Sequence, residues 1–186
     1  PAAAQAAALV PGIRAFGASS LRQAFDWILD EHKLEPAQPL PADPRPLHLD
    51  LAEIRGHETP KRALMVAAAG RHNLLMTGPP GSGKSALAKR LAGILTPATE
   101  AEALEILKIH TSHGFETRGL SRQRPFRSPH HTSSVASLLG GGQDPRPGEI
   151  SLSQHGVLFL DELAEFRREV LEGLRQPLED GYLTIG

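Results

Sequence analysis

The sequence contains no cysteine among its 186 residues, which excludes disulfide bonds and thiolate metal sites. This absence also fits a reducing cytosol, so we expect a cytoplasmic protein. No apolar run approaches the ~20 residues that span a bilayer, and no signal peptide is recognisable, so we expect no membrane partner. The formal net charge is only −1, so any contact with a polyanion must come from a local patch.

Composition along the chain predicts two parts and a linker. Residues 35–46 contain five prolines without periodicity, which is typical of a stiff, extended linker. We therefore expect an appendage over 1–34, a linker over 35–48 and an α/β domain over 49–186. The chain opens on Pro1 and stops at Gly186, directly after an apparent strand over 182–185. This indicates a fragment of a longer protein.

The appendage has few elements. Residues 1–8 are rich in alanine and predict the end of a helix, and residues 13–17 alternate like a short strand. Ser19 or Ser20 then caps a helix. Its apolar face consists of Leu21, Phe25, Ile28 and Leu29. Because too few residues precede this helix to cover that face, we expect it to close a truncated upstream domain.

The most specific feature of the chain is the segment 78–85, which matches the phosphate-binding pattern G-x-x-x-x-G-K-[ST]. An apolar run over 73–77 precedes it and predicts a buried parallel strand, while 84–95 predicts a helix. The order of strand, loop and helix is the one that the pattern requires. An ordinary Gly/Pro-rich loop is the alternative, and the flanking context disfavours it.

Each residue type in this loop has a chemical reason. Glycines let successive backbone N–H groups turn toward a phosphate, and the following helix adds its positive end. Lys84 is expected to reach the β- and γ-phosphates of ATP, and the Ser85 hydroxyl to ligate Mg²⁺. The predicted loop residues in contact with nucleotide are Gly78, Pro79, Pro80, Gly81, Ser82, Gly83, Lys84, Ser85 and Ala86.

A second motif lies downstream, where four apolar residues over 157–160 end in Asp161 and Glu162. The run predicts a central strand, and ligands bind where parallel strands end. Asp161 should therefore help to hold Mg²⁺, partly through water, and Glu162 should polarise the attacking water. Two solvated acids at a strand end are the alternative, which the pairing with the phosphate loop disfavours.

The other expected elements are mostly helices. They are a helix from about 58 to 69, one capped near Thr99, an irregular stretch over 110–132, short helices over 133–139 and 148–155, a helix from 169 to about 178 and a strand over 182–185.

These motifs together resemble the magnesium-chelatase-like AAA+ ATPases, and within them the ComM-type (YifB) competence branch. The matching segments are Gly56-His57, the phosphate loop, and the residues 124–132, 147–152, 156–162 and 174–181. The resemblance covers about 49–186. It implies an α/β fold, a three-layer αβα P-loop core with a parallel sheet. Residues 1–34 resemble the C-terminal tail of a Lon-protease-like domain.

The resemblance also implies a function. It predicts a hexameric, ring-forming ATPase that acts on DNA as a helicase in branch migration during natural transformation. The loop 140–148, with Arg146, would face the central pore. His57 stands where many relatives have glutamine near the adenine, and it can hydrogen-bond similarly. The arginine finger, sensor and lid would lie beyond Gly186, which predicts a fragment that binds nucleotide and hydrolyses it poorly.

Two further clusters leave alternatives open. The arginines Arg118, Arg122, Arg124 and Arg127, which occur together with Phe115 and Phe126, are consistent with DNA or phosphate contact, with pairing between subunits, or with a solvated loop. The nine histidines lack metal-ligand spacing, so a solvated or structural role is favoured over a zinc site. Besides the DNA motor, a chelatase-type motor that remodels a protein partner and a P-loop switch or kinase stay as hypotheses.

Overall fold

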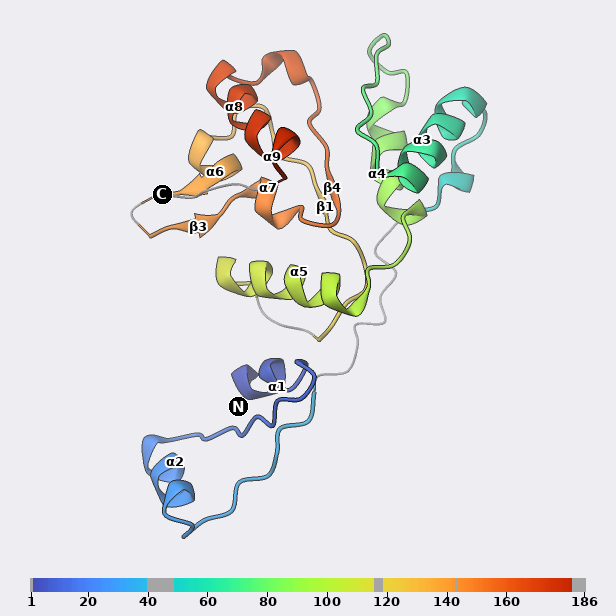
Figure 1. Ribbon diagram of the computed structural model, residues 1–186. Coiled ribbons are helices and arrows are strands. Elements are labelled where there is room, and N and C mark those ends of the chain that lie inside the picture. The colour runs from blue at the N-terminus through green and yellow to red at the C-terminus, as the bar shows by residue number, and fades with distance from the viewer. Residues whose placement is uncertain (1, 40–48, 116–118, 143, 182–186) are drawn as a thin grey trace. The chain divides into compact units, whose positions relative to one another are not determined.

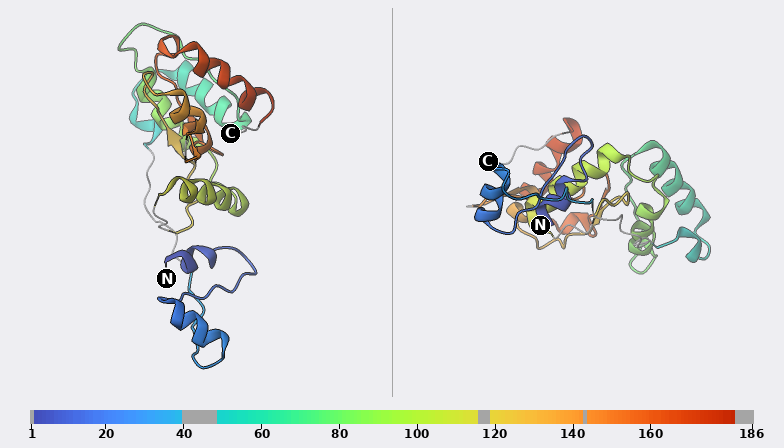
Figure 2. Two further views of the ribbon diagram at one scale, coloured as in Figure 1. Left: turned by 90° about the vertical axis from the view of Figure 1, so that its left-hand side faces the viewer. Right: turned by 90° about the horizontal axis from the view of Figure 1, so that it is seen from below.

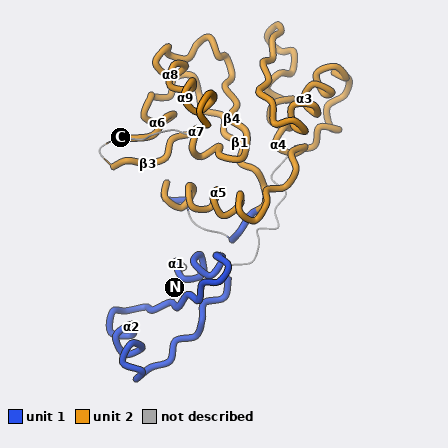
Figure 3. The backbone as a smooth tube through the Cα atoms, in the orientation of Figure 1, with its two compact units in different colours: residues 1–45, 114–121 blue, residues 46–113, 122–186 orange. Residues whose placement is uncertain are grey.

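The structure is a computed structural model that describes residues 2–39, 49–115, 119–142 and 144–181. The chain forms two compact units, Pro1–Arg45 with Gly114–Ser121 and Pro46–His113 with Arg122–Gly186 (Figure 3). The first unit contains α1 (Ala2–Ala7) and α2 (Leu21–Ile28). Ser20 is the N-cap of α2, because its hydroxyl accepts a hydrogen bond from the backbone N–H of Gln23. This confirms the expected helix and selects Ser20 over Ser19 as the cap.

The apolar face of α2 stays exposed, as its residue pattern suggested. Leu21 is 86% and Ile28 71% exposed. The ring of Trp27 instead packs on Phe16, with 4.9 Å between the ring centroids. Of the expected strand over 13–17, the structure has a single bridge from Phe16 to Pro36.

In the second unit, the first described elements are helices that precede and follow the phosphate loop. They are η1 (Leu51–Glu53), α3 (Glu58–Gly70), α4 (Lys84–Ile94) and α5 (Glu100–His113). Helices α3 and α4 lie side by side (Figures 1 and 2). Leu51, Leu64 and Leu87 form a core between them and η1. Burial of this core fixes the helix that follows the phosphate loop against the rest of the unit.

Helix α5 begins with a reciprocal capping box, as Thr99 predicts. The Thr99 hydroxyl accepts from the backbone N–H of Glu102, and the Glu102 carboxylate accepts from the backbone N–H of Thr99. Two donors that a helix start would leave unpaired are thereby satisfied. The helix runs on to His113, so the expected irregular stretch begins later than predicted.

A parallel pair of short strands leads toward the second motif of the sequence. β1 (Phe126–Arg127) pairs with β4 (Val157–Leu158), with Phe126 opposite Val157. Gly156 precedes β4 and lies against the carbonyl of Pro125, where a Cβ atom has no room. Helices next to a parallel pair make the unit an α/β structure.

The remaining elements are short. β2 (Gly140–Gly141) and β3 (Arg146–Pro147) form an antiparallel pair. The helices are α6 (Val135–Leu139), α7 (Glu149–Leu152), η2 (Leu163–Glu165), α8 (Arg168–Gly173) and α9 (Arg175–Glu179). Leu138, Phe166 and Val170 form a second core under them. One expected helix from 169 to about 178 is thus two helices that meet at Leu174.

Three strand predictions need correction or fall outside the structure. Residues 73–77 form no strand, and Leu75 is 72% exposed. A strand needs a neighbour for its backbone groups, and nothing in the described residues pairs with this segment. The strand expected over 157–160 has two residues, and β1 lies in the stretch expected to be irregular. The strand expected over 182–185 lies outside the described residues.

Candidate functional site

The phosphate loop turns where its glycines permit. Gly81 and Gly83 have φ angles of 75° and 81°, in the left-handed region that favours glycine. Gly83 is the N-cap of α4. The ammonium group of Lys84 lies inside the turn and donates to the carbonyl oxygens of Gly78 and Pro79, each at 2.9 Å. A cation and a helix start therefore lie at one place, as an anion site requires.

The two sequence motifs meet in the second unit. The Ser85 hydroxyl donates a hydrogen bond of 2.7 Å to Oδ2 of Asp161, across 76 residues of chain. The other carboxylate oxygen, Oδ1, accepts from the backbone N–H of Glu162 at 3.1 Å. Hydroxyl and carboxylate oxygens are the ligands that Mg²⁺ prefers, so this pair fits that ion.

Glu162 has an unusual backbone beside this pair. Its φ and ψ are 54° and 52°, and it is the N-cap of η2. Left-handed backbone is disfavoured for a residue with a Cβ, and such strain gathers at functional sites. Its side chain is 66% exposed, and Nδ1 of His131 lies 3.4 Å from its Oε2. The carboxylate is thus open to water next to the oxygens that suit Mg²⁺.

His57, predicted to lie near the adenine, lies next to the phosphate loop. It is the left-handed N-cap of α3, with φ 59°. A Cβ atom on Gly83 would lie 3.8 Å from the ring nitrogen Nε2 of His57. The other predicted loop residues lie in the phosphate loop itself or in the first turn of α4. Within the loop, the backbone N–H of Ser82 donates to the carbonyl oxygen of Pro79 at 3.3 Å. Ala86 lies in that first turn of α4.

Arg124 is an interior residue, which corrects its assignment as a DNA contact. It is 5% exposed. Its guanidinium donates to the carbonyls of Thr96 at 2.6 Å and His155 at 2.7 Å, and to the Glu102 carboxylate at 2.9 Å. A buried guanidinium with these partners has no route to a phosphate. Sequence reasoning missed it because its partners lie far away along the chain.

Glu102 is the centre of this interior network. Besides Arg124, it accepts a hydrogen bond of 3.0 Å from Arg71 at the end of α3. The backbone N–H of Thr99, and after it the Arg124 side chain, lower the pKa of Glu102 from 4.5 to about 2. Nδ1 of His155 lies 3.7 Å from the same carboxylate. One carboxylate therefore ties together the end of α3, the start of α5 and the approaches to both parallel strands.

The other three arginines differ in how firmly they are held. Arg127 makes two hydrogen bonds of 2.6 Å to Glu149, which raise the pKa of Arg127 above its usual value. Arg122 is exposed and donates to the carbonyl of Ala98 at 2.9 Å. Arg146, in β3, pairs with Asp144 at 2.9 Å while its side chain stays 60% exposed.

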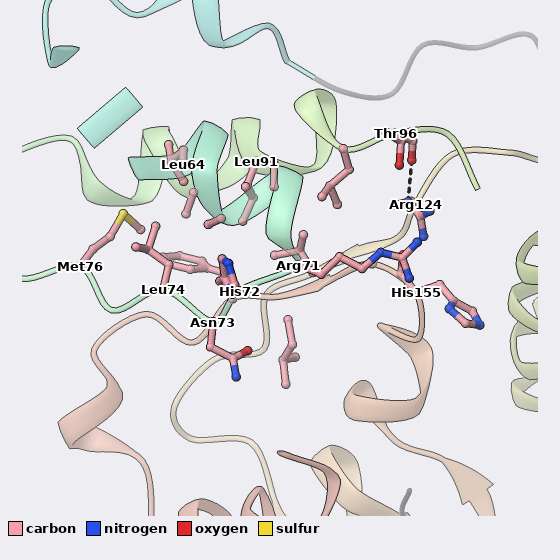
Figure 4. A pocket seen from close by; sticks show the side chains of 18 residues that line it. Leu64, Arg71, His72, Asn73, Leu74, Met76, Leu91, Thr96, Arg124 and His155 are labelled. Atoms are coloured by element: carbon pink, nitrogen blue, oxygen red, sulfur yellow. Dashed lines mark hydrogen bonds between the residues drawn. The ribbon is translucent and has the colours of Figure 1, made fainter. Parts of the chain in front are cut away.

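A pocket of about 260 Å³ lies below the helices, between residues 73–76 and β4 (Figure 4). Leu64 and Leu91 line it from α3 and α4, and Arg124 and His155 lie at one end (Figure 4). Its lining includes no residue of the phosphate loop and neither Asp161 nor Glu162. We therefore place the candidate nucleotide site at Lys84, Ser85 and Asp161 and not in this pocket.

Two general features bear on partners. Within the described ranges, no helix has the length and apolar character needed to cross a bilayer. Nor do three or more His, Asp or Glu side chains of those ranges gather into a group that could hold a metal ion. The Ser85–Asp161 pair is a different type of site, since Mg²⁺ at nucleotide sites is bound by few protein groups together with substrate phosphates.

Comparison with known proteins gives consistent relatives. The family described as "Magnesium chelatase, subunit ChlI" matches residues 50–186. The competence protein ComM of Haemophilus influenzae is 54% identical over 138 residues, which are 74% of this chain and 27% of that protein. The YifB protein of Escherichia coli is 45% identical over 180 residues, 95% of this chain and 35% of that protein. The chain thus spans about a third or less of these relatives' length.

One solved structure also resembles the chain. It is NtrX from Brucella abortus in complex with ADP, with a TM-score of 0.49 and 19% identity over 76% of this chain and 26% of that chain.

Proposed function

Because this chain belongs to the magnesium chelatase subunit ChlI family and resembles its ComM/YifB members, we propose that it is the ATP-binding and ATP-hydrolysing core of an AAA+ motor. One observation carries the proposal: the 2.7 Å hydrogen bond from Ser85 to Asp161. It joins the phosphate loop to the acid pair, which are the two halves that P-loop hydrolysis of ATP needs.

Each residue then has a role toward ATP. Lys84, which donates to loop carbonyls in this structure, would turn its donors to the β- and γ-phosphate oxygens. Ser85 and Asp161 would hold Mg²⁺, which neutralises charge on the phosphates. Glu162, exposed beside them, would accept a proton from the attacking water. His57 would lie near the adenine.

The same proposal extends to the whole protein. Residues 49–186 would form the ATPase core, 35–48 a linker, and 1–34 the tail of a Lon-protease-like domain. By analogy with AAA+ motors, the proposal includes a ring-shaped hexamer with DNA in its pore, located in the cytoplasm. Identity of 54% with a competence protein fits the resemblance noted in the sequence, and on that resemblance we further propose action on DNA, as a helicase in branch migration. The exposed Arg146 would contact DNA phosphates.

The test compares full-length wild-type protein with Glu162→Gln, with and without DNA. Glutamine keeps the size and hydrogen bonding of the side chain but cannot take a proton. We expect the variant to bind ATP normally and to turn over far more slowly, and DNA to stimulate the wild-type rate. Wild-type turnover in the variant would remove Glu162 from the reaction.

A second function is favoured by the description of the matching family itself. A magnesium-chelatase-type motor would use the same ATP cycle to remodel a protein partner for metal insertion into a porphyrin. The two functions share the site at Lys84, Ser85 and Asp161 and differ in what stimulates the ATPase. Stimulation by DNA supports the helicase, and stimulation by a chelatase partner without any response to DNA supports the alternative.

A further inference from the structure

His131 reaches Glu162 because the parallel strands place the two residues at one edge. Arg127 ends β1 opposite Leu158, which ends β4. His131 follows Arg127 by four residues, and Glu162 follows Leu158 by four residues. Parallel strands end on the same side of a sheet, so equal spacing brings these side chains together. Their closest polar atoms, Nδ1 and Oε2, are 3.4 Å apart.

The ring of His131 is held by neighbours on two sides. The His130 ring lies against it with 4.1 Å between centroids, and Phe166 meets it edge-on at 6.4 Å. Phe166 is 4% exposed and belongs to the core formed with Leu138 and Val170. The imidazole is therefore anchored to a packed interior, while the carboxylate that it faces is exposed.

The two histidines have different polar neighbours. Nδ1 of His130 accepts from the backbone N–H of Thr132 at 3.3 Å, and the Thr132 hydroxyl lies 2.9 Å from the same nitrogen. The partner of His131 is instead a carboxylate, which can only accept when it carries no proton. In the tautomer that carries its proton on Nδ1, His131 can donate toward this carboxylate across the 3.4 Å separation. The imidazole side chain is shorter and more rigid than that of lysine or arginine. An imidazole donor is therefore suited to orienting a single carboxylate oxygen.

Glu162 needs such an anchor. Its left-handed backbone aims the side chain outward, and 66% of that side chain is exposed. A free carboxylate would be distributed over several rotamers, and a base that is misplaced by about 1 Å loses much of its rate. We propose that His131 is a positioning residue that holds the Glu162 carboxylate in the orientation that accepts the proton of the attacking water. This inference rests on the proposed ATPase function.

The test uses His131→Ala and His131→Asn in the full-length protein. We expect His131→Ala to lower kcat about tenfold or more, the loss typical of partners that orient a functional group. ATP affinity and KM should stay unchanged, because His131 acts on the proton acceptor and not on the groups that bind the phosphates. Asparagine keeps an N–H donor near the position of Nδ1, so His131→Asn should recover most of the rate. His72→Ala, which removes the histidine ring packed beside Gly70, is the matched control and should leave kcat unchanged.

A double variant separates positioning from a general loss of structure. If His131 acts only through Glu162, then His131→Ala adds no further loss to Glu162→Gln. Additive losses in the double variant would overturn the inference. So would an unchanged or faster kcat in His131→Ala, or an equal loss of kcat in His131→Asn. These outcomes differ from failure of the proposed function, which would show as wild-type turnover in Glu162→Gln alone.

Discussion

Replacing Arg124 by methionine should destabilise the second unit without acting on DNA directly. The guanidinium is 5% exposed and donates to two carbonyl oxygens and one carboxylate at 2.6 to 2.9 Å. Methionine preserves much of the side-chain volume and removes every donor. The carbonyls of Thr96 and His155 then lack this partner, and Glu102 keeps a negative charge with one cation fewer.

The magnitude follows from these missing partners. A hydrogen bond to a charged group contributes about 1.5–3 kcal/mol, and the three partners of Arg124 are partly buried. Because the losses share one network, they do not add fully. We therefore expect a loss of about 1.5–3 kcal/mol in the free energy of unfolding. Arg146→Met is the control, since its pair with Asp144 is exposed and should be worth less than about 1 kcal/mol.

The assay is urea denaturation, with DNA affinity measured in parallel on folded protein. We expect a lower denaturation midpoint for Arg124→Met and unchanged DNA affinity where that variant is still folded. A stability within about 0.5 kcal/mol of the wild type, the range of an ordinary surface substitution, would refute the structural role. A loss of DNA affinity at unchanged stability would restore Arg124 as a DNA contact.

Three other predictions concern nucleotide affinity, stability at low pH and DNA affinity. Lys84→Ala should weaken binding of ATP with Mg²⁺ at least about tenfold by calorimetry, because it removes the cation beside the expected phosphates; unchanged affinity would contradict the site. Since the pKa of Glu102 falls from 4.5 to about 2 on folding, the carboxylate stabilises the fold above about pH 4.5 and this contribution disappears as the pH falls toward 2. The denaturation midpoint should drop over that range in wild type and less so in Glu102→Gln, and equal drops would contradict the network. Arg146→Ala should flatten the salt dependence of DNA affinity by roughly one unit of slope for each phosphate that the arginine neutralises, and an unchanged slope would remove this residue from the DNA surface.

Much of the site could be predicted from the sequence because its signals are local. The helix start at Lys84, the cap at Thr99 and the turn over 78–83 each depend on residues that lie close together along the chain. Capping boxes and glycine turns are decided at that range. The meeting of Ser85 with Asp161 is not local, and it followed from the general rule that ligands bind where parallel strands end.

The strands were predicted less well because a strand depends on its neighbour. The apolar run over 73–77 has the composition of a buried strand but forms none, whereas Phe126–Arg127 forms one beside Val157–Leu158. Hydrogen bonds between strands connect residues that sequence patterns cannot pair. His131 was missed for the same reason, since its relation to Glu162 exists only once β1 and β4 are in register.

The arginines show what a local reading of charge leaves out. Arg124 and Arg127 have no acid close by in sequence, yet each pairs with a glutamate 22 residues away, Glu102 upstream and Glu149 downstream. To bind a phosphate, Arg127 would have to leave a bidentate partner, which is among the stronger side-chain contacts. Arg146 would have to leave only Asp144, and because that ion pair is exposed, it contributes little to stability. Among Arg124, Arg127 and Arg146, the free energy needed to exchange partners therefore favours Arg146, in β3, as a contact to phosphate.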